Sequence, residues 1–233
     1  MNSPLVEYVM YSPNHGGKRA HAIDRITPHC VVGQCSIEGL GDVFLPEKRR
    51  ASSNYGIGTD GRVGLFVDED IHSWCSSNWA NDERAVTIEC ASDAYAPYAF
   101  NQTVYSRLID LCEDICKRNR KTKLLWLEDM SKTLAYQPKP DEMILTVHRW
   151  FAPKSCPGDW MFVRMGDLAS KVTARLQGKP EPNSKTIYRV QIGSFSTEQA
   201  ADHYKNICAE ALRKQGVIDD DPKKAPFVKP VSL

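Results

Sequence analysis

The segment LTVHRWFAPKSCPGDWM, residues 145–161, gathers side chains that can bind a metal or act on a substrate. It places His148, Lys154 and Cys156 on one short loop before a predicted helix. Imidazole nitrogen and thiolate sulfur are ligands that zinc prefers, and a catalytic zinc site uses three protein ligands plus a water. A third ligand must therefore come from elsewhere, and the best candidate is His29, in the segment DRITPHCVVG. We expect these two distant segments to close one metal site.

Two predicted strands must position this chemistry. Residues 21–32 alternate apolar and polar side chains as a half-buried strand does, with His29 near its end. Residues 85–91 are rich in β-branched side chains, which predicts a central strand. Glu89 is anomalous in that strand, because burying a carboxylate is costly unless it is paired or used. Pairing with a neighbouring arginine and use in the chemistry are both open at this point.

The remaining pattern predicts an α/β fold with a mixed central sheet of about five or six strands flanked by helices. The dipeptide Asp60-Gly61 predicts a hairpin within residues 51–69, and residues 122–129 predict a further strand. Residues 1–20 are polar and rich in proline and glycine, so we expect them to form an arm across the surface. Helices are expected over residues 36–45, 101–119 and 159–177, with Gly178 ending the last one.

Four segments together resemble one known family. The chain is similar, over about residues 12–176, to zinc-dependent N-acetylmuramoyl-L-alanine amidases of the type shared by peptidoglycan recognition proteins and phage endolysins. Any one segment alone is weak evidence, but all four occur in the order that the family uses. They are SPNHGGKRAHAIDRITPHCVVG, ASSNYGIGTDGRVGLFVDE, SWCSSNWANDERAVTIECA and HRWFAPKSCPG.

The resemblance implies roles for individual residues. His29, His148 and Cys156 would hold Zn²⁺. Glu89 matches the strand carboxylate that takes a proton from the attacking water and passes it to the leaving amine, and Lys154 matches a lysine that stabilises the oxyanion. The expected reaction is hydrolysis of the amide between N-acetylmuramic acid and L-alanine. The matching segments also supply candidate substrate-binding residues: Asn54, Tyr55, Trp74, Asn78 and Asn81. Trp74 and Trp79 are equally open to a role in packing their loop.

The charge balance and apolar content of the chain limit the kinds of partner that it can bind. Lys plus Arg number 30 and Asp plus Glu number 29, so the bulk charge favours neither nucleic acid nor an anionic membrane as partner. No apolar run approaches the length of a membrane span, and the N-terminus lacks the pattern of a signal peptide. We expect a monomer that acts on bacterial peptidoglycan after release or export, as phage or prophage endolysins do.

The other cysteines and histidines have plainer interpretations. Except for Cys156, the eight cysteines are interpreted as reduced core residues, since a cytosolic product of this size seldom carries a disulfide framework. Cys112 and Cys116, four residues apart, share one helix face and more often pack than bind metal. The histidines outside the metal site, namely His15, His21, His72 and His203, are expected at the surface.

The C-terminal part forms a second predicted unit. Residues 178–186 are rich in proline and polar side chains, which is typical of a linker between residues 1–177 and residues 187–233. The opening YRVQIGSFSTEQA resembles SPOR domains, which bind peptidoglycan strands stripped of their peptides, although the segment departs from that family's length. A strand, a turn capped by Ser196, an amphipathic helix and a returning strand are expected there, which makes a small βα module.

Two other functions remain open at this stage. One is a non-catalytic peptidoglycan-binding protein of the same fold, a class that typically loses the zinc-binding cysteine, whereas Cys156 is present. The other is a cysteine peptidase of the cell wall, with a cysteine nucleophile and a histidine base. Such a peptidase would need neither His29 nor a metal.

Overall fold

The computed structural model describes residues 1–182 and 197–214. The chain divides into two compact units, Met1–Ser184 and Lys185–Leu233. In the second unit the described residues form one helix, α7 (Glu198–Lys214), in the region where an amphipathic helix was expected. The two strands and the Ser196 cap predicted for this unit lie outside the described residues.

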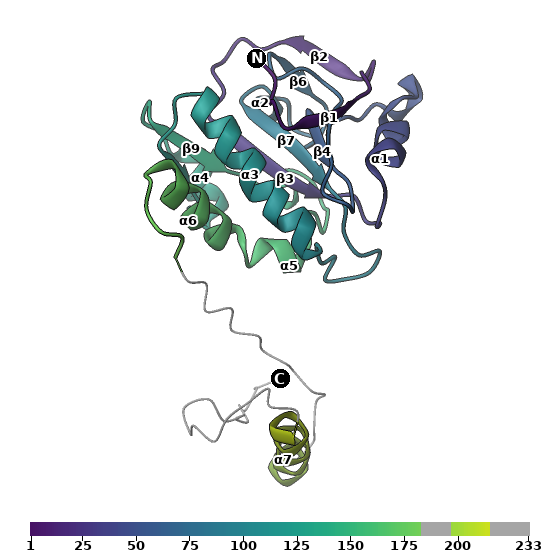
Figure 1. The fold of residues 1–233 in the computed structure, drawn as a ribbon, viewed down its shortest axis with the longest axis vertical. Coiled ribbons are helices and arrows are strands. Elements are labelled where there is room, and N and C mark those ends of the chain that lie inside the picture. Colours follow the sequence, from purple (N-terminus) through teal and green to yellow (C-terminus); the bar gives the residue numbers. More distant parts are fainter. Residues whose placement is uncertain (183–196, 215–233) are drawn as a thin grey trace. The chain divides into compact units, whose positions relative to one another are not determined.

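A mixed seven-stranded sheet organises the first unit (Figure 1). The strand order is β1-β5-β4-β7-β3-β9-β8, and only β4 and β5 pair antiparallel. The α/β class with a central mixed sheet is therefore confirmed, with more strands than expected. The strands are β1 (Val6–Val9), β3 (Arg25–Cys30), β4 (Tyr55–Ile57), β5 (Val63–Leu65), β7 (Ala85–Cys90), β8 (Lys123–Leu125) and β9 (Glu142–Leu145).

The prediction of an N-terminal surface arm is wrong. Strand β1 forms one edge of the large sheet, and β2 (His15–Lys18) pairs antiparallel with β6 (Ile71–Ser73) in a separate two-stranded sheet. Both N-terminal strands are short and partly exposed. Val6 and Tyr8 of β1 nevertheless pack against the two buried apolar clusters of the domain.

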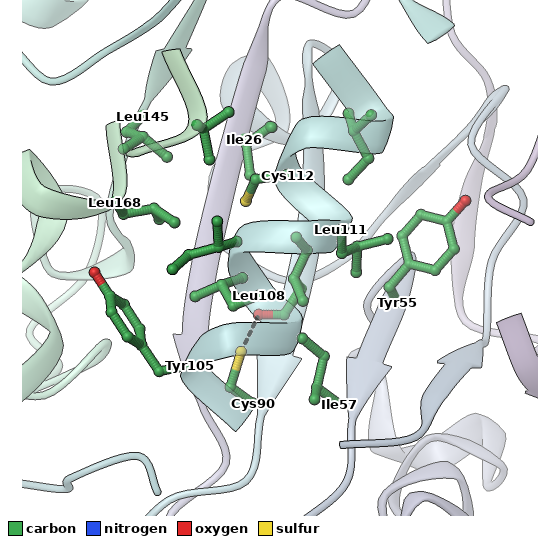
Figure 2. Packing of buried hydrophobic residues seen from close by; sticks show 14 of the residues in the cluster. Ile26, Tyr55, Ile57, Cys90, Tyr105, Leu108, Leu111, Cys112, Leu145 and Leu168 are labelled. Carbon is green, nitrogen blue, oxygen red and sulfur yellow. Dashed lines mark hydrogen bonds between the residues drawn. The ribbon is translucent and has the colours of Figure 1, made fainter. Parts of the chain in front are cut away.

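Two helices pack on one face of the large sheet. Helices α3 (Gln102–Arg118) and α6 (Met165–Leu176) contribute apolar side chains to one buried cluster with β3, β4, β5, β7 and β9. Figure 2 shows Leu108, Leu111 and Cys112 of α3 packing over Ile26 and Ile57 of the sheet. The predicted third helix is broken, because α5 (Asp159–Phe162) ends before α6 begins. Gly178 follows α6 with φ 63°, as expected of a residue that ends a helix.

The opposite face is covered only in part. Helix α1 (Ile37–Phe44), capped by Ser36, packs Ile37, Leu40 and Phe44 against Phe66 in a second apolar cluster. A Cβ on Gly56 of β4 would lie 2.5 Å from the Phe66 ring, so a glycine is needed for this close approach. The short helix α2 (Trp79–Asp82) contacts β7.

Strand alternation decides which side chains reach this second face. Ile88 and Cys90 of β7 belong to the α3 cluster, as do Ile26 and Cys30 of β3. Because successive side chains of a strand point to opposite faces, Glu89 and His29 lie on the other face, away from α3. The remaining described elements are η1 (Glu47–Arg49), α4 (Met130–Ala135) and η2 (His148–Trp150). No helix among the described residues is long and apolar enough to cross a membrane.

Candidate metal centre and active site

Two parallel neighbours, β3 and β7, place the first pair of functional side chains. His29 and Glu89 are direct partners in the register of these strands, and each lies one residue before the end of its strand. His29 is fully buried, and its Nδ1 lies 4.0 Å from Oε1 of Glu89. The pairing of two strands far apart in the sequence therefore brings an imidazole and a carboxylate side by side.

The loop after β9 brings the other two predicted ligands to this pair. Sγ of Cys156 lies 3.3 Å from Nδ1 of His29, and the rings of His29 and His148 are 5.0 Å apart between centroids. The backbone N–H of Cys30 also donates to Sγ of Cys156 at 3.4 Å. Gly158 lets the loop turn here, since it has φ 83° and a Cβ on it would lie 2.7 Å from the carbonyl oxygen of Pro97.

The donor set fits a divalent metal such as zinc. One ligand atom from each of His29, His148 and Cys156 lies within 4.8 Å of the other two. Tetrahedral zinc with ordinary bond lengths separates a nitrogen and a sulfur ligand by about 3.6 Å, close to the 3.3 Å between His29 and Cys156. Three protein ligands are the number typical of a catalytic zinc site.

Burial sets the protonation of these groups. It lowers the pKa of His29 well below the ordinary value, which favours the neutral imidazole that metals bind. Burial also lowers the pKa of His148, helped by the positive charge of Lys154. The pKa of the Cys156 thiol is raised by burial well above its ordinary value. A cation among these atoms would reverse that last shift, since a coordinating thiol loses its proton.

Glu89 has the environment of a proton carrier. Burial raises its pKa to about 7, against a smaller opposing effect of the hydrogen bond from Cys75 and of the positive charge of Arg49. Its Oε2 is buried and has no hydrogen-bond partner within the part of the chain that the structure describes. A carboxyl group that titrates near neutral pH can both accept and return a proton.

Lys154 lies on the exposed part of the same loop. Its ammonium group makes no hydrogen bond or ion pair with any residue of the described ranges 1–182 and 197–214, although its charge reaches His148. The group is therefore free to approach a bound anion from the side of His148.

Three of the five candidate substrate-binding residues lie inside the domain. Asn54 is fully buried, and its amide nitrogen donates to the carbonyls of Val67, Asp68 and Ile71. The hydroxyl of Tyr55 is buried between the Ser3 N–H at 2.8 Å and the Glu69 carboxylate at 2.6 Å. These contacts hold the fold together and leave neither side chain open to a ligand.

Asn81 is likewise enclosed. It has no exposed surface, and its amide makes four hydrogen bonds of 3.1–3.2 Å. The partners are the side chains of Thr27, Ser76, Arg25 and Thr146. Asn81 of α2 therefore links the polar side chains of the sheet face beneath this helix into one hydrogen-bond network.

The other two candidates are accessible. Trp74 is 39% exposed and directly follows β6. Asn78 is half-buried, and its side chain caps α2 by accepting a hydrogen bond from the N–H of Asn81. Trp79 is 63% exposed and has its ring edge-to-face with His72.

Sequence reasoning missed two residues that touch the site and misplaced a third. The Cys75 thiol lies 3.8 Å from Oε1 of Glu89, and Ser77 Oγ lies 3.3 Å from Nε2 of His148. Their position between Trp74 and Asn78, in a segment that resembled the family, was the available signal. His72, expected at the surface, is 2% exposed and lies 3.5 Å from Glu83, because β2 covers it. Seven cysteines of the first unit are free: Cys30, Cys35, Cys75, Cys90, Cys112, Cys116 and Cys156.

Comparison with known proteins finds a matching family and similar folds. A family model described as N-acetylmuramoyl-L-alanine amidase matches residues 18–159. The structure is similar to that of a mutant of PlyL, with a TM-score of 0.50 and 11% identity over 72% of this chain and 98% of that one. It is also similar to the Staphylococcus aureus hydrolase AmiA in complex with its ligand, with a TM-score of 0.50 and 12% identity over 77% of this chain and 88% of that one. At these identities the likeness concerns the fold alone. A search of curated proteins found no match.

Proposed function

The chain belongs to the N-acetylmuramoyl-L-alanine amidase family, and from this premise we propose that it is a zinc-dependent hydrolase of bacterial peptidoglycan. The bond cleaved is the amide between the lactyl group of N-acetylmuramic acid and L-alanine of the stem peptide. One observation carries the proposal: the ligand atoms of His29, His148 and Cys156 converge within 4.8 Å beside the buried carboxylate of Glu89.

The two imidazoles and the thiolate are assigned as the zinc ligands. When bound, zinc would supply a water of lowered pKa and would polarise the scissile carbonyl. The three side chains would hold the metal on the sheet face that α3 does not cover, where β3, β7 and the loop after β9 meet. With a divalent zinc ion bound, one thiolate and two neutral imidazoles would leave the site with a net positive charge, which would favour an anionic transition state.

Glu89 and Lys154 are assigned the proton transfer and the charge stabilisation. Glu89 accepts the proton of the attacking water and delivers it to the nitrogen of L-alanine as the carbon–nitrogen bond breaks. Its raised pKa suits both steps near neutral pH. The ammonium group of Lys154 stabilises negative charge on the carbonyl oxygen. It is available for this role because it has no other partner among the described residues.

Among the five candidate substrate-binding residues, exposure favours Trp74 and Asn78. The indole of Trp74 can stack on a sugar or peptide face while its N–H donates a hydrogen bond. Asn54, Tyr55 and Asn81 are assigned to the framework beneath the site, since their polar atoms already have partners.

We also propose the wider setting that the sequence suggests. Residues 1–177 would be the catalytic domain, residues 178–186 a linker, and residues 187–233 a SPOR-like module that binds the cell wall. A catalytic domain joined to a wall-binding module is typical of phage or prophage endolysins, which act as monomers once they reach the wall.

A cysteine peptidase is the second candidate, because one contact favours it. His29 would be the base of this peptidase, contrary to the expectation from sequence that it would not be needed, because its Nδ1 lies 3.3 Å from Cys156 Sγ, about the distance between a thiol nucleophile and its base. The peptidase would retain activity after metal removal, whereas the amidase would lose it.

The test measures zinc content and turnover in matched variants. We expect Cys156→Ala and His29→Ala to lose bound zinc and activity together, and Glu89→Gln to keep zinc and lose turnover. Cys112→Ala is the control, since Cys112 is a fully buried cysteine on the α3 side of the sheet. A His29→Ala protein that is zinc-free and fully active would refute the metal assignment.

A further inference from the structure

We propose that the loop Cys75–Ser77 is a positioning element of the active site, in which Cys75 holds Glu89 and Ser77 holds His148. This inference rests on the proposed function, because it assigns roles relative to the general base and a metal ligand. The loop leads from β6 to α2 and contributes no ligand to the assigned set of His29, His148 and Cys156.

Cys75 is placed to orient the carboxylate of Glu89. Its Sγ lies 3.8 Å from Oε1, within the reach of a weak sulfur hydrogen bond, while Oε2 has no partner in the described part of the chain. Because a carboxylate can only accept hydrogen bonds, the thiol of Cys75 is the donor in this contact. One oxygen of Glu89 is thereby held, and the other remains available for the substrate water.

Ser77 is placed to orient the imidazole of His148. Its Oγ lies 3.3 Å from Nε2, and the residue adopts φ 60°, a conformation that non-glycine residues seldom take. Such strain costs about 1–3 kcal/mol and persists only where surrounding contacts enforce it. With Nε2 held by Ser77, Nδ1 of His148 would be the metal-binding nitrogen. A hydrogen bond to the other nitrogen of such a histidine fixes both the tautomer and the ring orientation.

One buried carboxylate holds both of these residues in place. Asp82, 3% exposed, accepts hydrogen bonds at 3.1 Å from the backbone N–H of Cys75 and of Ser76. The carboxylate therefore fixes the backbone immediately before Ser77 as well as the backbone of Cys75. These contacts make the loop a rigid link between the sheet residue Glu89 and the loop residue His148.

The same residues admit a different assignment, which the experiment must exclude. Ligand atoms of His29, Cys75 and Glu89 also lie within 4.8 Å of one another, so Cys75 is a possible metal ligand. In that case Cys75 would act on the metal and not on the carboxylate, and its removal would weaken metal binding.

The experiment measures zinc affinity by competition with a chromogenic chelator, and kcat and KM on a soluble N-acetylmuramoyl peptide. For Cys75→Ala we expect kcat to fall about tenfold, with KM and zinc affinity unchanged, because misplacement of a reacting group lowers the rate. Cys112→Ala is the matched control, since it also removes a buried thiol but lies across the sheet from the site. It should leave kcat and zinc affinity unchanged.

For Ser77→Ala we expect zinc affinity to fall about tenfold or more, as loss of an outer-shell partner does. Ser77→Gly should weaken zinc equally, while the zinc-free protein becomes no less stable, because glycine adopts φ 60° without strain. A purely structural role would instead lower stability and leave zinc affinity alone.

The inference is overturned if Cys75→Ala loses zinc, if it keeps full kcat, or if both Ser77 variants bind zinc as the parent does. An inactive parent protein would refute the proposed function and the role of Cys75. The zinc affinities would still decide the role of Ser77, so the two failures are distinguishable.

Discussion

Replacing Asn81 by alanine tests whether this residue supports the site or binds the substrate. Asn81→Ala removes an amide that is fully buried beneath α2 and makes four hydrogen bonds. Alanine cannot replace any of them. Three partners, the hydroxyl groups of Thr27, Ser76 and Thr146, are themselves fully buried, so water cannot take the place of the amide.

The expected loss of stability follows from these contacts. A hydrogen bond contributes about 0.5–1.5 kcal/mol net, and a buried partner left unsatisfied costs about 1–3 kcal/mol. Thr27 and Thr146 keep their mutual hydrogen bond of 2.7 Å, which limits the cost. We therefore expect the free energy of unfolding to fall by about 3 kcal/mol, a large share of the roughly 5–15 kcal/mol of an ordinary domain.

Urea unfolding followed by tryptophan fluorescence provides the assay. All five tryptophans lie within residues 74–160, so the signal reports the first unit alone. Asn78→Ala is the control, because Asn78 lies three residues earlier and makes one capping hydrogen bond to Asn81 N–H. It should cost about 1 kcal/mol.

Because Asn81 is buried and fully engaged inside the domain, we expect zinc-loaded Asn81→Ala, under conditions where it is folded, to keep the KM of the parent. An unchanged free energy of unfolding together with a raised KM would refute it. Asn81 would then be a substrate-binding residue, and the buried network would have to rearrange in solution.

Three further predictions concern two residues inside the domain, Tyr55 and Gly56, and the exposed Lys154 beside the site. Tyr55→Phe should lower the free energy of unfolding by about 1–2 kcal/mol without changing KM, since the hydroxyl contacts Ser3 and Glu69 inside the domain; a raised KM with unchanged stability would contradict this. Gly56→Ala should cost about 1–3 kcal/mol in urea unfolding, because the new methyl group meets the Phe66 ring, and a variant as stable as the parent would show that this interface is loosely packed. Lys154→Ala should retain zinc and stability but lower kcat about tenfold, because the assigned positive charge at the carbonyl oxygen is lost; unchanged kcat would remove Lys154 from the mechanism.

The fold class was predictable because the central strand and helix each carry a clear pattern of apolar residues in their own sequence. Residues 85–91 and 101–119 carry enough apolar periodicity to identify β7 and α3. Strands β1 and β2 could not be found this way, since they are short and their burial alternates weakly or not at all.

The site was predictable only where residue chemistry is distinctive. His29, His148 and Cys156 stand out as potential ligands, and the structure brings them together. Asn54 and Asn81 were predicted to bind substrate, yet each is buried on partners that include residues far away in the chain, 13 positions for Asn54 and Val67 and 65 positions for Asn81 and Thr146. The contacts of Cys75 and Ser77 depend on the path of a loop that no periodicity encodes.

Mass spectrometry of the fragments released from purified peptidoglycan, with and without a chelator, tests whether this protein is a zinc-dependent amidase. We expect stem peptides that begin with a free L-alanine amine, abolished by chelation and restored by added zinc. Cleavage inside the stem peptide that survives chelation would contradict it in favour of a cysteine peptidase. Retained binding without any cleavage would contradict it in favour of a peptidoglycan-recognition protein.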